Sequence, residues 1–211
     1  MSIDLHWDHN GWYQGRLLRA LPGHLNEVLD VGCGAGAFAA RLAQRAHHVD
    51  AIDRAPHMIT LAQERVPRNV DVRVADVATV PLPHTHYDAV TSISVLHHLE
   101  LTQVLPRLAE ALRPGGLLIA VAQPKIDLPR DLPVEALSVV GHRLLGAAFR
   151  VEQTVTGRRR YAYESSVHVM PMQDAVLTTR QVRAQAANVL PNVQVRRLPF
   201  WRYALRWQRP R

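Results

Sequence analysis

The chain has 211 residues, of which 47% are hydrophobic and 20% charged, and its formal net charge is +7. This length is typical of one compact domain, and the balanced composition excludes a disordered or low-complexity protein. The positive charge raises the question of an anionic partner, but the arginines of the last third lack the interleaved aromatic and glycine pattern of an RNA-binding sheet, so we do not expect nucleic acid as the partner.

The N-terminal residues MSIDLHWDHNGW do not resemble a secretory signal, because they have neither a basic start nor an apolar segment. No uninterrupted apolar run approaches the roughly 20 residues of a membrane-spanning helix. Cys33 has no partner for a disulfide and no zinc-site spacing, which agrees with a reducing compartment. We therefore expect a cytoplasmic protein without a membrane contact, and we expect residues 1–24 to form a cap before the first strand.

Short apolar runs alternate with segments of helical periodicity along the chain. The pattern predicts strands at 27–31, 48–53, 70–75, 87–93, 116–122, 193–198 and 201–208, and helices at 37–45, 56–65, 102–112 and 178–190. This alternation is typical of a parallel sheet with helices on both faces, and the last two strands follow a turn like an antiparallel pair. The expected fold class is α/β, a Rossmann-like doubly wound sheet of five parallel strands plus a C-terminal antiparallel hairpin, seven strands in all.

Residues 124–177 interrupt this pattern after the fifth strand. Prolines cluster at 124–133, and one apolar helical stretch follows at 134–149. A run of this kind is more often a core or lid helix than a membrane contact, and Arg143 within it favours an aqueous face. We expect a single domain over 1–211 in which 124–177 is an insertion on the substrate side.

Three glycines stand at every second position after the first strand, in EVLDVGCGAG at 27–36. A glycine loop between a strand and a helix offers free backbone N–H groups at a positive helix end, with no Cβ to keep a ligand away. Gly32, Gly34 and Ala37 also fit the dinucleotide template G-x-G-x-x-G/A, which is weak evidence when it stands alone. The loop therefore predicts a nucleotide-like ligand, and a dinucleotide stays open at this point.

An acid stands at the carboxyl end of each of the first three strands. Asp30 precedes the first glycine by two positions, where its carboxylate can hold a cationic group. Asp53 lies about 20 residues beyond the loop, where a carboxylate can accept hydrogen bonds from both ribose hydroxyls. Asp76 follows the third strand, where it can accept a hydrogen bond from an adenine amino group. Together they indicate an adenosine ligand with a positive charge, although each acid has a plainer alternative as a loop, helix or turn cap.

Several short motifs follow one another in a specific order. They are LDVGCGAG at 29–36, Asp53, AD at 75–76, YDAVTSISVLHHL at 87–99, LRPGG at 112–116 and the final RRLPFWRYALRW at 196–207. In this order they resemble the class I S-adenosylmethionine-dependent methyltransferases, over roughly the first 120 residues and the terminal strand pair. The resemblance implies that S-adenosylmethionine is the cofactor.

The resemblance also implies cofactor contacts by position. Gly32 and Gly34 would lie along the methionine part with Asp30 near its ammonium, while Asp53 would hold the ribose and Asp76 the adenine amine. Further implied contacts are a backbone donor from Val77, an adenine face covered by Met58, backbone carbonyls of Ile93 and Ser94 near the methionine amino group, and Tyr13 or His9 at the methionine carboxylate.

His97 and His98 follow the fourth strand at the carboxyl edge, where ligands bind in open α/β sheets. One of them, with His97 the first candidate, can accept a proton from a substrate hydroxyl or amine, and the alternative is a packing or positioning role. No histidine pair has the i, i+4 spacing with an acid that marks a zinc protease, so we expect no metal. Asp50 and Asp71 are expected to be solvated.

The expected activity is S-adenosylmethionine-dependent methyl transfer to an O, N or C nucleophile of a small, partly apolar metabolite held between residues 6–13 and the insertion. Positioning the nucleophile in line and excluding water can supply most of the catalysis, so a general base is optional. One alternative is an RNA methyltransferase or a noncatalytic module that binds S-adenosylmethionine or RNA. Another is a nicotinamide-dependent oxidoreductase, which Asp30 and the closing hairpin disfavour.

Overall fold

The structure is a computed structural model that describes residues 5–157, 161 and 174–211. The C-terminal part of the expected insertion, at 158–160 and 162–173, lies outside the described residues.

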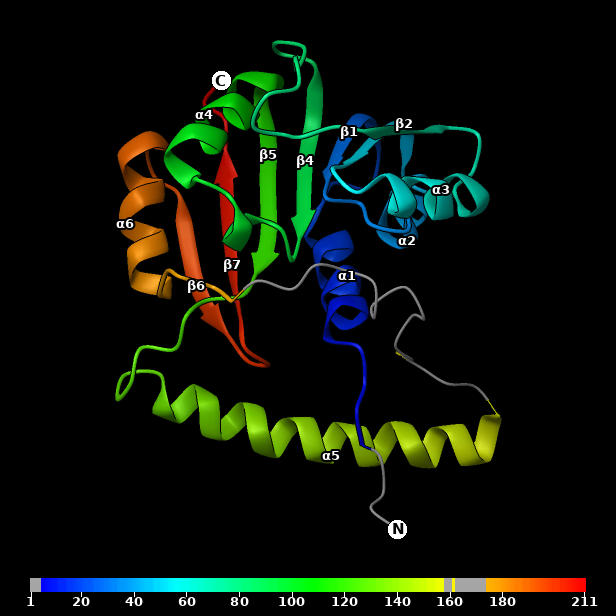
Figure 1. Ribbon diagram of the computed structural model, residues 1–211, viewed down its shortest axis with the longest axis vertical. Coiled ribbons are helices and arrows are strands. Elements are labelled where there is room, and N and C mark those ends of the chain that lie inside the picture. Colours follow the sequence, from blue (N-terminus) through cyan, green and yellow to red (C-terminus); the bar gives the residue numbers. More distant parts are fainter. Residues whose placement is uncertain (1–4, 158–160, 162–173) are drawn as a thin grey trace.

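Seven strands form one mixed sheet in the order β3-β2-β1-β4-β5-β7-β6 (Figure 1). The strands are β1 (Leu25–Val31), β2 (Ala46–Asp53), β3 (Val70–Val74), β4 (Tyr87–Ile93), β5 (Leu112–Ala122), β6 (Gln194–Leu198) and β7 (Arg202–Gln208). The first five pair in parallel, whereas β7 runs antiparallel to both β5 and β6. The predicted α/β fold class, with five parallel strands and a closing hairpin, is confirmed.

Two helical layers cover the sheet and enclose two apolar cores. Helices α1 (His9–Ala20), α2 (Ala37–Leu42) and α3 (Pro56–Arg65) pack on one face, and α4 (Leu101–Ala111) and α6 (Thr179–Val189) on the other. A short 3-10 turn, η1 (Leu96–His98), joins β4 to α4. Neighbouring residues of β1 enter opposite cores, Val28 one and Leu29 the other, which explains why its sequence is apolar without alternation.

Most predicted boundaries of the sheet and its flanking helices agree with the structure to within two residues, and those of α2 and β5 differ by more. Helix α2 ends at Leu42 rather than at 45. Strand β5 begins at Leu112 rather than at 116, because Tyr87 pairs with Leu112 before the register between β4 and β5 shifts at Ala89 and Leu117. The LRPGG motif therefore belongs to an irregular strand start instead of a helix end.

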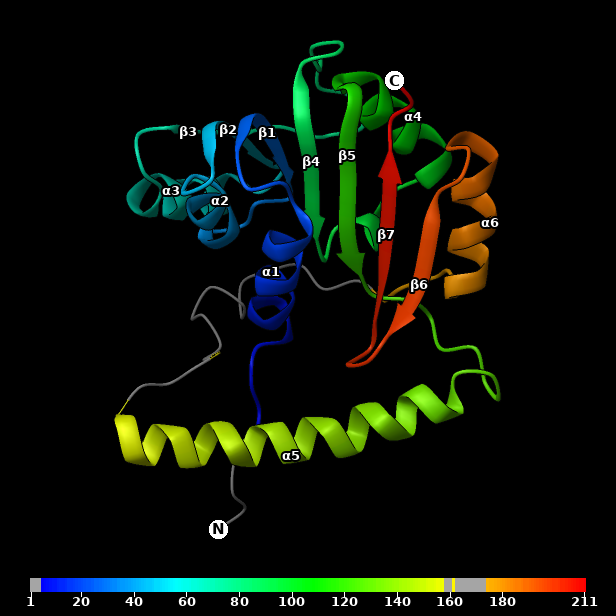
Figure 2. The same ribbon diagram turned by 180° about the vertical axis from the view of Figure 1, so that it is seen from behind.

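Helix α5 (Leu132–Thr156) lies apart from both layers, across the end of the molecule toward which β4 and β5 point (Figures 1 and 2). It is longer than the predicted 134–149, and its buried residues are Ser138 and Gly146. Among the described residues it is the one helix long and apolar enough to cross a membrane by length and composition. Of the two expected roles, a core helix or a lid helix, the core role is wrong, because most of its aliphatic side chains are exposed; the lid role stays a prediction.

Candidate functional site

A pocket of about 200 Å³ opens at the carboxyl ends of the first four strands. The strand order reverses between β1 and β4, and open α/β sheets bind ligands at such a point. The predicted site residues on its wall are Asp30, Gly32, Gly34, Asp53, Met58, Asp76, Val77, Ile93, Ser94 and His98. Tyr13, its alternative His9, and His97 are not part of that wall.

Gly32 and Gly34 make the tight turn that leaves β1. Gly32 has φ +72°, and a Cβ built on it would lie 2.0 Å from Cγ2 of Val95. Gly34 has φ +54°. The absence of a side chain at Gly32 is therefore required by the protein's own packing, in addition to any close approach of a ligand.

Asp53 ties the glycine loop to the end of β2. Its Oδ2 accepts a hydrogen bond from the Gly34 N–H at 2.9 Å, and its Oδ1 accepts one from the Ala55 N–H at 2.9 Å. Ala55, not Asp53, is the N-cap of α3. The carboxylate is thus fixed in the pocket wall by backbone donors and does not serve as a helix cap.

Asp30 is a buried carboxyl group with one unsatisfied oxygen. The residue is 2% exposed, its Oδ1 accepts a hydrogen bond from the Thr91 hydroxyl at 2.8 Å, and its Oδ2 has no hydrogen-bond partner among the described residues. Burial raises the pKa of Asp30 to about 7; the Thr91 hydrogen bond lowers it and the charge of Asp53 raises it further. An unpaired buried carboxylate on a pocket wall suits a cationic ligand group, because such a group would offset the cost of desolvation.

The part of the pocket expected to hold adenine is formed by residues after the end of β3 and in the first turn of α3. The Ala78 N–H donates to Asp76 Oδ1 at 2.8 Å, so Asp76 begins a turn, which is the structural role that the sequence left open for it. Asp76 also lines the pocket. Met58 and Val77 are 2% and 5% exposed. Both present apolar surface to the pocket, as a planar base would require.

Tyr13, which was expected at the methionine carboxylate, lies outside the pocket wall. Its side chain is 3% exposed, and its hydroxyl donates to the Pro199 carbonyl at 2.7 Å, so α1 uses this residue to pack against the sheet. Asp8, Asn10 and Gln14 line the pocket instead. Asp8 is the N-cap of α1 and accepts a hydrogen bond from the Asn10 N–H. Because aspartate is a preferred N-cap residue, Asp8 is the sequence signal that could have predicted where α1 begins and which of its residues reach the pocket.

Asn10 also links α1 to the strand ends beside the pocket. Its Oδ1 accepts hydrogen bonds from the Ser94 hydroxyl at 2.8 Å and from the Arg202 guanidinium at 3.1 Å. Ser94 follows β4 with φ +59°. One amide side chain thus connects three segments that are remote in sequence, which sequence reasoning alone missed.

His97 and His98 lie with their ring centroids 3.8 Å apart, but only His98 lines the pocket. Burial, followed by the charges of His98 and Arg202, lowers the pKa of His97 to about 3. Burial, followed by the charge of Arg54, also lowers the pKa of His98. A direct role in this pocket therefore passes from His97, the first candidate, to His98, whose imidazole is neutral at neutral pH.

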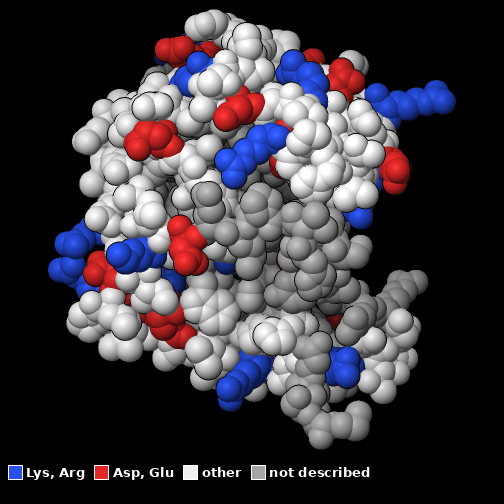
Figure 3. All heavy atoms as spheres, viewed as in Figure 1, with Lys and Arg blue, Asp and Glu red and all other residues white. Residues whose placement is uncertain are grey.

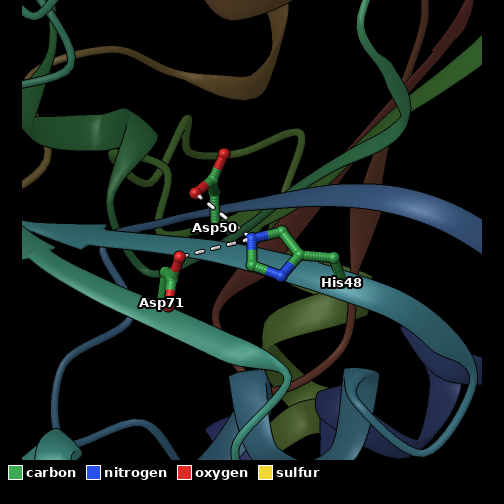
Figure 4. Close-up of side chains that lie close together, drawn as sticks. All are labelled: His48, Asp50 and Asp71. Atoms are coloured by element: carbon green, nitrogen blue, oxygen red, sulfur yellow. Dashed lines mark ion pairs between the residues drawn. The ribbon is translucent and has the colours of Figure 1, made fainter.

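A second cluster of titratable groups lies on β2 and β3, outside the pocket (Figure 4). His48 Nε2 is 3.7 Å from Asp50 Oδ1 and 3.7 Å from Asp71 Oδ2, and these are the one group of possible metal ligands among the described residues. Arg73 lies 3.8 Å from Asp50 Oδ1, and the Tyr87 hydroxyl donates to Asp50 Oδ2 at 2.5 Å. The expectation that Asp50 is solvated is therefore wrong, because it is paired with these groups, whereas Asp71 is exposed as expected. The Arg73 guanidinium already supplies a positive charge beside Asp50.

Comparison with known proteins identifies relatives of the whole chain. Residues 28–116 match a family of methyltransferase domains. An uncharacterized methyltransferase of Mycobacterium tuberculosis is 32% identical over 211 residues, which cover 99% of this chain and 100% of that protein. The ubiquinone biosynthesis O-methyltransferase of Methylocella silvestris is 35% identical over 118 residues, 54% of this chain and 44% of that protein.

Solved structures share the fold at low identity. A putative S-adenosylmethionine-dependent methyltransferase from Listeria monocytogenes superposes with a TM-score of 0.64 and 16% identity, over 96% of this chain and 97% of that one. The N-methyltransferase NodS from Bradyrhizobium japonicum, in complex with S-adenosyl-L-homocysteine, gives a TM-score of 0.60 and 16% identity over 97% and 89%. With a relative that is similar over nearly its whole length, the chain belongs to the class I S-adenosylmethionine-dependent methyltransferases.

Proposed function

We propose that this methyltransferase transfers the methyl group of S-adenosylmethionine to an oxygen, nitrogen or carbon nucleophile of a small, partly apolar molecule. The observation that carries the cofactor's orientation is the unpaired, buried Oδ2 of Asp30 beside the glycine loop. A ligand that combines an ammonium group with a nucleoside would supply the positively charged partner that this oxygen lacks.

The residues of the pocket fit S-adenosylmethionine from one end to the other. Asp30 and the glycine loop would hold the methionine part, Asp53 the ribose hydroxyls, and Asp76 the adenine amine, with Val77 and Met58 on the base. When bound, the cofactor supplies an electrophilic methyl group on a sulfonium. The protein's own contribution is to fix the acceptor in line and to exclude water from it.

His98 is our candidate for a base. It lines the pocket, and its lowered pKa keeps the imidazole free to accept a proton at neutral pH. His97 would act only by packing against His98, since burial lowers its pKa to about 3. The Ile93 and Ser94 carbonyls, at the end of β4, complete the methionine side of the proposed site.

The charge of the pocket wall supports a small, partly apolar acceptor over nucleic acid. Four carboxyl groups line the pocket, against one guanidinium, that of Arg54. A phosphate backbone would be repelled by this balance. Phe38, Val95 and Leu99 give the wall apolar surface. The Methylocella relative, by its name, is an O-methyltransferase of ubiquinone biosynthesis, and an acceptor of comparable polarity suits this wall.

We further propose that the chain acts as one domain in the cytoplasm. Cys33 is a free, buried thiol, and burial raises its pKa well above the ordinary range, so this cysteine gives no reason to expect an oxidising compartment.

Transfer of a labelled methyl group tests the proposal. The protein is incubated with methyl-labelled S-adenosylmethionine and cell extract, which is then separated into small molecules, protein and RNA. Label is expected in the small-molecule fraction, in species that partition into organic solvent, and the Asp53→Ala variant serves as the control for cofactor-dependent transfer. Label that appears in RNA instead would contradict the proposed acceptor class.

A further inference from the structure

Helix α5 turns its aliphatic side chains away from the protein. The exposed ones are Leu132, Leu137, Val139, Val140, Leu144, Val151 and Val155, with exposed fractions between 44% and 80%. They recur at helical spacing and form one stripe along the helix, which we call the outer face of α5. A core helix would bury this stripe, and contiguous exposed apolar surface of this kind marks an interaction site.

The opposite side of α5 is fixed to the protein by apolar packing of Leu145 and Phe149 against one of the two cores and by polar and small residues. The Ser138 hydroxyl accepts a hydrogen bond from the Phe200 N–H at 2.8 Å, and the Trp7 indole donates to the His142 carbonyl at 3.1 Å. Gly146 lies so close to the segment before α1 that a Cβ on it would come within 2.3 Å of a backbone oxygen. These contacts fix the rotation of the helix, so the outer face cannot turn inward without breaking them.

The charges on α5 are also divided between its two sides. Arg143 and Arg150 are the charged residues exposed on the helix, whereas Glu135 and Glu152 are half-buried. Glu135 forms an ion pair with Arg197 of β6. Figure 3 shows both basic and acidic side chains among uncharged surface at this end of the molecule. The outer face is therefore apolar with two positive charges and no exposed acid.

This combination distinguishes between possible partners. A helix that crossed a bilayer would place Glu135 and Glu152 in hydrocarbon, at a cost of several kcal/mol. In a symmetric antiparallel pair with a second copy, crossing at the middle of the helix, Arg143 of each chain would meet the same residue of the other without an acid to pair with. A negatively charged lipid surface offers acyl chains to the apolar stripe and anionic headgroups to the two arginines.

We propose that the outer face of α5 binds the surface of an anionic lipid bilayer, with its aliphatic side chains at the acyl boundary and Arg143 and Arg150 at the headgroups. This differs from the sequence-based expectation of no membrane contact, and it goes beyond the proposed function without depending on it. The carboxyl edge of the sheet lies on the same side of the molecule as α5 (Figures 1 and 2). A docked enzyme would therefore hold its pocket toward the lipid.

Vesicle sedimentation of the full chain tests this surface. The probes are vesicles of phosphatidylcholine alone and of phosphatidylcholine mixed with phosphatidylglycerol, at low and at high salt. We expect the protein to sediment with the mixed vesicles and to be released by salt. The variant Leu137→Glu/Val140→Glu/Leu144→Glu should bind at least tenfold more weakly, and Arg143→Gln/Arg150→Gln should lose about fivefold per arginine at low salt.

Leu61→Glu is the matched control, because Leu61 is also an exposed leucine on a helix, at 40%, but lies on α3. It should bind mixed vesicles as the unaltered chain does, and circular dichroism should show that every variant is folded. The proposal is overturned if the unaltered chain stays in the supernatant with mixed vesicles, or if Leu61→Glu weakens binding as much as the triple variant. It is also overturned if analytical ultracentrifugation shows a dimer that the triple variant dissociates, because a second copy would then cover this face.

Discussion

Asp30 makes cofactor binding depend on pH in a definite direction. Burial raises its pKa to about 7, so in the free protein the carboxyl is protonated below pH 7 and must lose that proton before it can pair with an ammonium group. The affinity for S-adenosylmethionine should therefore rise as the pH passes through 7 and should fall about tenfold per unit as the pH drops below it. Calorimetric titrations between about pH 5 and 7.5, below the usual pKa of an α-amino group, measure this.

The Asp30→Asn variant is the control for that dependence. Its amide cannot ionise, so its affinity should be lower than that of the unaltered chain at pH 7.5 and nearly constant toward acid pH. An unaltered chain whose dissociation constant does not change between these pH values would remove Asp30 from the ammonium.

Asp53 should contribute strongly to cofactor affinity. Replacement by alanine removes the acceptor of the Gly34 and Ala55 N–H groups and the proposed partner of the ribose hydroxyls. We expect the dissociation constant to rise about 10- to 100-fold, which corresponds to roughly 1.5–3 kcal/mol for hydrogen bonds to a charged group. Asp71→Ala, an exposed acid on the next strand, should leave it unchanged; equal values for Asp53→Ala and the unaltered chain would contradict the ribose assignment.

Gly32 should be intolerant of a side chain. Alanine there would have to adopt φ +72° with its Cβ 2.0 Å from Cγ2 of Val95. The combined strain and overpacking should lower the free energy of unfolding by about 2–4 kcal/mol, measured by urea denaturation. Gly23→Ala is the matched control, since no atom lies within 4 Å of its Cβ position; an equally large loss there would show that the reason is not local packing.

At the scale of elements, the cap of α6 is a device that the sequence encodes locally. The Thr178 hydroxyl accepts from the Gln181 N–H, and the Gln181 side chain accepts from the Thr178 N–H, so both close a capping box. Thr178→Ala should lower the free energy of unfolding by about 1 kcal/mol. Thr154→Ala, an exposed threonine inside α5, should stay within about 0.5 kcal/mol; similar losses at both positions would argue against capping.

Periodicity in the sequence predicted which segments form helices and which form strands. It did not predict where each helix lies in the fold. The runs at 56–65 and 87–93 were predicted at the observed bounds, because a helix with one apolar face and a strand buried on both faces leave distinct patterns. For 134–149 the same apolar content led to the expectation of a core or lid helix, and the core role is wrong. Composition does not say which side of a helix will form hydrogen bonds with the rest of the protein. Here the donors, the Trp7 indole and the Phe200 N–H, come from distant parts of the chain.

At the scale of the whole molecule, the pocket and the outer face of α5 should act independently. S-adenosylmethionine at about 100 times its dissociation constant should stabilise the folded state by about 2.7 kcal/mol and raise the melting temperature by about 5–11 °C for a chain of this size. The Leu137→Glu/Val140→Glu/Leu144→Glu variant should show the same rise in a thermal melt. A rise less than half as large would mean that α5 supports the pocket and that the two sites do not act independently.

The sequence by itself determined the sheet, its order of strand types and the acids at its carboxyl edge. The sequence alone predicts Asp30, Asp53 and Asp76 beside one another, because parallel strands bring their carboxyl ends to one edge of the sheet. Only the tertiary structure decided that Tyr13 packs rather than binds, that His98 rather than His97 reaches the pocket, and that α5 faces outward. Each of these depends on which side of a helix or turn meets residues remote in sequence, and such contacts leave no local pattern.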